Sequence, residues 1–237
     1  MKVTNKIHRG TSLAAAIIML LMLFFATITK ALTLFATHSA YENAEYIRQI
    51  ANFLISAFTS ILLIVVLFRG KKDAFSGAVF IISALPLVFG MFSNMSFAFM
   101  QLVVQSVPAN MAASLTGSAF IQVFANLVSI IFRVLLAVEC FKPGNISRGK
   151  MKALLLVLPI VAIIANALAM AVQSLHLLTD YDFVDYLSIA MLPAIFSAIG
   201  SIPTVIMGLS LSIPVYQKPA YDYMYGAQQN YDYTCNN

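Results

Sequence analysis

Long apolar stretches alternate along the chain with shorter polar ones. Because a helix rises about 1.5 Å per residue, roughly 20 apolar residues cross the hydrocarbon of a bilayer. Stretches of this kind predict six transmembrane helices, at about 11–29, 50–68, 74–92, 114–137, 153–173 and 187–213. We therefore expect an all-α polytopic integral membrane protein, a bundle of six transmembrane helices within residues 1–213, followed by a polar tail at 214–237.

The segment after the third predicted span, residues 95–107, carries no charge and is too apolar for an ordinary loop. It either continues the third helix to about Ser106 or lies in the membrane interface. Pro108 ends the segment in both cases, because proline lacks the N–H group that a continuing helix needs.

The composition agrees with the pattern of spans. Of 237 residues, 61% are hydrophobic and 10% are charged, and the mean hydropathy is +0.89. A soluble domain needs polar surface to meet water, so this composition excludes a soluble globular protein. The lipid bilayer is the first partner that the sequence implies.

Basic residues gather in three of the polar segments between spans. They are Lys2, Lys6, Arg9, Arg69, Lys71, Lys72, Lys142, Arg148, Lys150 and Lys152. Cells retain Lys and Arg on the cytoplasmic side of a membrane, so we expect these segments and both termini to be cytoplasmic. The formal charge of +5 then reflects orientation, with the plasma membrane as the expected location, and we expect no nucleic-acid partner.

Residues 1–31 allow a second interpretation, a cleaved signal peptide with a basic start and a small residue near its end. Its apolar run is longer than the usual length of about 7–15 residues, and no convincing small-x-small cleavage site follows. We therefore expect this segment to remain as the first span.

Polar side chains form stripes along several predicted spans. The fourth span carries its stripe at spacings of three and four residues: Ser114, Ser118, Gln122, Asn126, Ser129 and Arg133. Such groups avoid lipid, so the stripes of different helices should face one another or water. As lining of a pathway or polar contact between helices we predict Asn52, Asn94, Gln122, Asn126, Ser129, Arg133 and Asn166. The two alternatives are close helix packing and a water-lined cavity.

Arg133 is the ionisable residue that we place inside the hydrocarbon. It could bind an anionic group, but the sequence offers no acid within another span to pair with it. Because it lies near the cytoplasmic end of its helix, its long side chain could instead extend outward to the interface. We expect the second arrangement.

Catalysis finds no support in the sequence. The chain lacks HExxH, GxSxG, CxxC and phosphate-binding loop motifs, so we expect no enzyme, no catalytic residue and no cofactor. His176, Asp180, Asp182 and Asp185 lie in one outer loop without an ordered ligand pattern, and we interpret them as solvated residues, not as a metal site. Cys140 and Cys235 lie on the reducing side, where no structural disulfide is expected.

The C-terminal tail mixes tyrosine with small and polar residues and has no apolar periodicity, so we predict disorder. It is either a tolerated extension or a docking segment for a cytoplasmic protein. The residues that would make such contacts are Tyr221, Tyr223, Tyr225, Tyr231 and Tyr233.

Two function classes remain. The first, which we prefer, is a passive or partner-dependent permease component for a small solute, because the chain has neither a nucleotide-binding motif nor evident proton-coupling acids within its spans. The second is a non-catalytic membrane adaptor or assembly factor that docks a membrane or cytoplasmic protein through its loops and tail. A permease requires a wet cavity, whereas an adaptor does not.

Overall fold

The computed structural model describes residues 4–37, 43–103, 109–174 and 192–216, and these residues are largely helical. The helices are α1 (Arg9–Thr37), α2 (Asn43–Arg69), α3 (Ala74–Val103), α4 (Ala109–Phe141), η1 (Lys150–Ala153, a short 3-10 turn), α5 (Leu154–Gln173), α7 (Leu192–Gly200) and α8 (Ile202–Ser212). Within the described ranges, five helices are long and apolar enough to cross a membrane. The all-α polytopic membrane bundle is therefore confirmed.

The sixth predicted span is a broken helix. Helix α7 ends at Gly200 and α8 begins at Ile202, with Ser201 between them. Pro203 stands in the first turn of α8, where its missing N–H group costs nothing because that position has no helical acceptor. The part of the predicted span before Leu192 lies outside the described residues.

Helix α3 resolves the alternatives for residues 95–107 as far as they are described. It continues unbroken to Val103, well past the predicted end at residue 92. The extended-helix alternative is therefore correct up to that residue, and α4 begins soon afterwards at Ala109.

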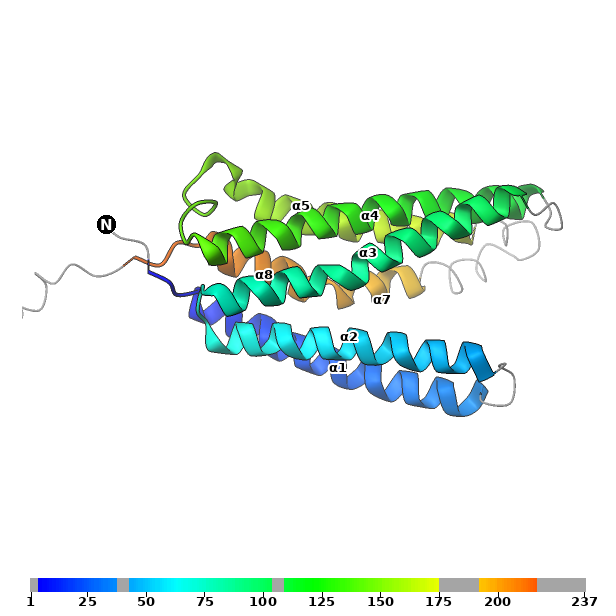
Figure 1. Ribbon diagram of the computed structural model, residues 1–237, viewed down its shortest axis with the longest axis horizontal. Helices are drawn as coiled ribbons and strands as arrows, with labels where there is room; N and C mark the ends of the chain where they lie inside the picture. Colours follow the sequence, from blue (N-terminus) through cyan, green and yellow to red (C-terminus); the bar gives the residue numbers. More distant parts are fainter. Residues whose placement is uncertain (1–3, 38–42, 104–108, 175–191, 217–237) are drawn as a thin grey trace, which may run out of the picture.

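The helices pack in two groups. Helices α3, α4 and α5 share the most extensive contacts, whereas α1 and α2 form a hairpin that contacts the rest mainly through α8 and α3. Figure 1 shows this hairpin beside the other helices, closest to them at one end of the bundle.

Both ends of the described chain meet at one end of the bundle. The N–H group and the hydroxyl of Thr4 each donate to the carbonyl of Val215, both at 2.8 Å. The α2–α3 and α4–α5 turns lie at the same end (Figure 1). We call it the basic end, defined by residues 4–9, 69–73, 142–153 and 213–216. Because the first and last described residues lie at the same end of the bundle, the chain between them crosses the membrane an even number of times, as six spans require.

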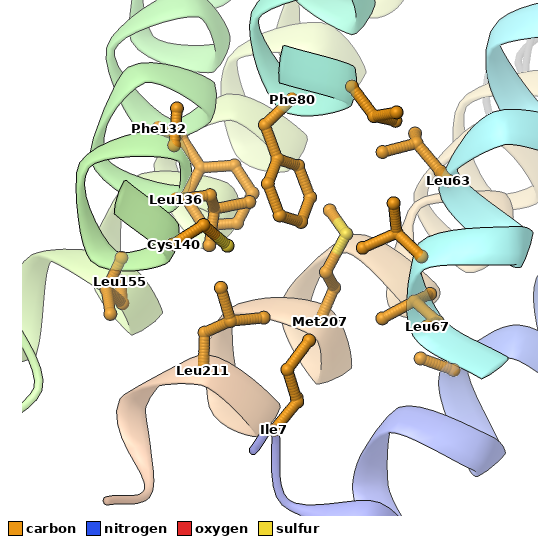
Figure 2. Packing of buried hydrophobic residues seen from close by; sticks show 14 of the residues in the cluster. Ile7, Leu63, Leu67, Phe80, Phe132, Leu136, Cys140, Leu155, Met207 and Leu211 are labelled. Atoms are coloured by element: carbon orange, nitrogen blue, oxygen red, sulfur yellow. The ribbon is translucent and has the colours of Figure 1, made fainter. Parts of the chain in front are cut away.

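The main hydrophobic core lies close to the basic end. Ile7 of the N-terminal segment (residues 4–8) enters it, and Met207 lies at its centre between α2 and α4 (Figure 2). Its largest buried members include Leu67, Phe80, Phe132, Leu136, Leu155, Met207 and Leu211. Because helices α1, α2, α3, α4, α5 and α8 all contribute side chains, this core is the point at which the hairpin and the remaining helices are joined.

Asp73 begins α3 as its N-cap. Its Oδ1 accepts hydrogen bonds from the N–H group of Ser76 at 2.9 Å and from the hydroxyl of Ser76 at 2.8 Å. Its Oδ2 accepts from Nη2 of Arg69 at 2.7 Å. Partial burial by itself raises the pKa of Asp73, but the Ser76 hydrogen bonds and the charges of Arg69 and Lys71 outweigh it and hold that pKa below its usual value.

Replacing Asp73 with alanine is expected to destabilise the protein by about 1 kcal/mol at neutral pH, because the first turn of α3 loses its cap. A carboxyl whose folded pKa is lowered stabilises the fold above its unfolded pKa of about 3.9, and this contribution is lost as pH falls through the folded value. Thermal unfolding of the detergent-solubilised protein should therefore separate wild type from Asp73→Ala at pH 7 and less so below pH 4. Asp73→Asn, which keeps an acceptor, should lose less, and equal melting at pH 7 would contradict the assignment.

Candidate functional site

A cavity of about 370 Å³ lies between the α1–α2 hairpin and the remaining helices. We call it the central cavity. Helices α1 and α2 line it with apolar side chains that include Met19, Met22 and Phe53, and the opposite side is formed by residues of α3, α4, α7 and α8. Its volume is in the range of small-ligand sites.

Hydroxyl groups supply much of the polar lining. They belong to Ser56, Thr59, Ser60, Ser83 and Thr204. Ser60 donates to the carbonyl of Ser56 at 2.9 Å, and Ser83 donates to the carbonyl of Phe80 at 2.7 Å. Hydroxyls that donate within their own helix keep oxygen lone pairs free to accept from water or from a ligand.

Arg133 provides the positive charge of the central cavity. Its Nη1 lies 3.7 Å from the sulfur of Met207, and its guanidinium carbon is 6.0 Å from the centre of the Phe132 ring. Across the described ranges, no carboxylate lies within ion-pair distance of it. The sequence-based expectation of a side chain extended outward to the interface was wrong, because the guanidinium points between the helices toward α8.

The core closes the central cavity toward the basic end. On α1, α3 and α8 the core residues lie nearer to the basic end than the cavity residues do, whereas Leu63 of α2 belongs to both sets and Phe132 and Arg133 of α4 are adjacent. On α1, Ala15 and Ala16 belong to the core and Met19 to the cavity, and on α3 the core residue Phe80 precedes the cavity residue Ser83. A solute in the cavity would therefore meet packed side chains toward the basic end.

The other predicted polar residues lie elsewhere. A Cβ atom added at Gly90 would lie 3.3 Å from Nδ2 of Asn126, which places this amide against α3. The hydroxyl of Ser129 donates to the carbonyl of Ala125 at 2.9 Å. Asn94, Gln122 and Asn166 are half-buried and Asn52 is exposed. Of the seven predicted residues, all of them described, Arg133 is the one that lines the central cavity.

Several sequence-based expectations concern residues outside the described part of the chain. These are the tail tyrosines, the loop with His176 and its three aspartates, and Cys235. Cys140 is described, and it is buried as a free thiol in the core. In the described ranges, no cluster of three His, Cys, Asp or Glu residues could hold a metal ion.

A buried ion pair at the basic end was missed by sequence reasoning. Nζ of Lys72, in the α2–α3 turn, lies 2.7 Å from Oε1 of Glu139 near the end of α4, and both side chains are fully buried. Lys72 also donates to the carbonyl of Leu211 at 3.2 Å, which ties the end of α8 to the pair. Lys72 was interpreted only as an orientation signal, and Glu139 was overlooked.

Glu139 also organises the turn between α4 and α5. Its carboxylate accepts from the N–H groups of Gly144, Ile146 and Ser147 at 2.9, 2.9 and 3.1 Å, and from the Ser147 hydroxyl at 2.7 Å. One sequence feature could have drawn attention to it: a single acid in the otherwise apolar LLAVECF that ends α4. An acid in such a place needs buried partners.

Comparisons of the chain with protein-family models, with curated proteins and with solved structures find no match. Function is therefore inferred from side-chain chemistry. Two groups of side chains could support a function: those of the central cavity, which include Arg133, and the charged groups of the basic end.

Proposed function

We propose that this protein is a permease component, passive or dependent on a partner, whose central cavity binds a small anionic solute in the plasma membrane. The observation that supports the proposal is Arg133, a guanidinium that lines a membrane-embedded cavity of about 370 Å³. Within the described residues, no carboxylate compensates its charge.

The physical reason is the cost of a charge in a membrane. An arginine inside the hydrocarbon region is unfavourable unless water, a counter-charge or a ligand compensates it. A sulfur atom and an aromatic ring are weak partners for a guanidinium, whose planar N–H groups match carboxylate and phosphate oxygens. An anion in the central cavity would supply those oxygens, and the neighbouring hydroxyls would accept from its own donors or from water.

The position of the core supports a transport role over simple binding. A permease must be closed at one side while its site is open to the other. The core closes the cavity at the basic end, where α8 and the N-terminal segment meet, and this is the end that we expect to face the cytoplasm. Movement of α8 relative to the hairpin would therefore be needed to release a solute inward. The break at Ser201 gives α8 a boundary about which it could move.

Charge-selective labelling tests the cavity. Single cysteines replace Ser60 and Thr204 in a Cys140→Ala, Cys235→Ala background, and each is treated with a sulfonate-bearing and a trimethylammonium-bearing thiosulfonate. The anionic reagent should react faster at both positions, because both line the same cavity as Arg133. Arg133→Gln should reduce this preference about tenfold, since a charge in a partly desolvated site contributes more than about 1 kcal/mol. Phe58→Cys, on an exposed face of α2 outside the cavity lining, is the control and should remain unlabelled in membranes.

Transport is measured separately, as efflux of radiolabelled acetate, lactate or inorganic phosphate from proteoliposomes, with Arg133→Gln as the matched variant. Efflux that Arg133→Gln abolishes would support the permease. Absence of labelling at both cavity positions would mean a dry interior, and charge-selective labelling without efflux of any of the three anions would favour the adaptor.

A further inference from the structure

A second pocket lies at the basic end, lined by the N-terminal segment, the first turns of α1, the end of α2 and the α2–α3 turn. Its volume is about 350 Å³, and four basic side chains line it: Lys6, Arg9, Arg69 and Lys71. We call it the basic pocket. It is separate from the central cavity, with which it shares no lining residue.

Backbone hydrogen bonds hold the walls of the basic pocket together. The N–H group of Ile7 donates to the carbonyl of Gly70 at 2.8 Å, and the N–H group of Lys72 donates to the carbonyl of Asn5 at 2.7 Å. These bonds form an isolated antiparallel bridge that pairs Lys6 with Lys71. Two segments distant in sequence are therefore fixed with their lysines directly opposite each other.

The charges of the basic pocket are poorly compensated. Like charges that face each other across a bridge repel. Asp73 pairs with Arg69 at 2.7 Å, but in the described part of the chain no carboxylate pairs with Lys6, Arg9 or Lys71. A fold that places these cations together gains stability from an anion bound among them.

Apolar side chains complete the basic pocket. Leu13, Leu67 and Phe68 line it beside the cations. Leu13 and Phe68 are also among the exposed hydrophobic residues, on the surface where α1 and α2 would meet lipid. A free phosphate ion would use only the charged part of this pocket, whereas a phospholipid has a phosphate for the cations and acyl chains for the apolar part.

We propose that the basic pocket binds the phosphate headgroup of an anionic phospholipid from the cytoplasmic leaflet. The basic end is the end that the distribution of Lys and Arg assigns to the cytoplasm. Anionic lipids give that leaflet a negative surface, and basic pockets between transmembrane helices on this side suit their headgroups. This site is independent of the anion site at Arg133.

The test measures lipid-dependent stability of the full-length protein in detergent. Short-chain phosphatidylglycerol is titrated against wild type, and phosphatidylcholine of the same chain length and inorganic phosphate are titrated separately. Phosphatidylglycerol should raise the melting temperature, and the double variant Lys6→Gln, Lys71→Gln should weaken its apparent affinity roughly thirtyfold. Lys150→Gln, Lys152→Gln removes the same charge from exposed residues at the same end, outside the basic pocket, and should change the affinity less than about threefold.

Different outcomes overturn the proposal. Equal effects of phosphatidylglycerol and phosphatidylcholine, or equal losses in the two double variants, would show that the pocket does not select the lipid. If inorganic phosphate at equal concentration reproduces the whole stabilisation, the site belongs to the free ion. Should the pocket variant fail to fold, Arg9→Gln, which changes one exposed side chain of the pocket, must still weaken phosphatidylglycerol binding severalfold, or the proposal is wrong.

Discussion

Replacing Glu139 with alanine is expected to destabilise the protein by about 3–5 kcal/mol, because it leaves the Lys72 ammonium buried without its counter-charge. The loss also removes the acceptor for three N–H groups of the α4–α5 turn. Chemical unfolding in mixed micelles measures the change, and the amount of protein in membranes gives a second readout.

The opposite variant should be milder. In Lys72→Met, Glu139 keeps the hydrogen bonds from Gly144, Ile146 and Ser147. In Glu139→Ala the Lys72 ammonium keeps its hydrogen bond to the carbonyl of Leu211 but loses its counter-charge. Lys142→Ala, an exposed lysine one residue beyond α4, is the control and should change stability by less than about 0.5 kcal/mol. A loss below about 1 kcal/mol in Glu139→Ala would mean that water reaches the pair.

Gly208→Ala should be nearly as damaging, at about 3 kcal/mol, because α8 has no room for a methyl group at this position. An added Cβ would clash with the backbone carbonyl of Leu155 at the start of α5 and would lie 3.2 Å from the ring of Phe132. A backbone atom cannot rotate away, so α8 would have to move out of the core.

Gly200→Ala is the matched control, since no heavy atom lies within 4 Å of a Cβ placed there. Both glycines lie in the broken sixth span, so the comparison separates lack of space from helix propensity. The expected result is a strong loss of melting temperature in Gly208→Ala and little change in Gly200→Ala. Similar behaviour of the two variants would show that α8 can shift without cost.

The bundle could be predicted from the sequence because each transmembrane span can be recognised from a short, continuous stretch of residues. The length of an apolar run and the basic residues beside it are local properties, and both were sufficient for α1 to α5. The break in the sixth span has a local signal too, in the sequence Gly200, Ser201, Ile202, Pro203, but a long apolar run conceals it.

The site was harder to predict because the neighbour that a side chain contacts changes with its position along the helix axis. One stripe on α4 carries both Asn126 and Arg133, yet the first lies against α3 and the second lines the central cavity. A helical stripe gives the direction of a side chain but not the neighbour that it meets at each level. The ion pair of Lys72 and Glu139 joins positions 67 residues apart, and nothing in the spacing of one sequence connects them.

The N-terminal segment has a consequence for the order of assembly. Thr4 is bonded to Val215, and the N–H group of His8 donates to the carbonyl of Ser210 at 3.4 Å. A chain is synthesised from its N-terminus, so these acceptors are made after the other described helices. The first described residues to leave the ribosome are therefore among the last of the described chain to reach their final positions, because they must wait until α8 has been made and inserted.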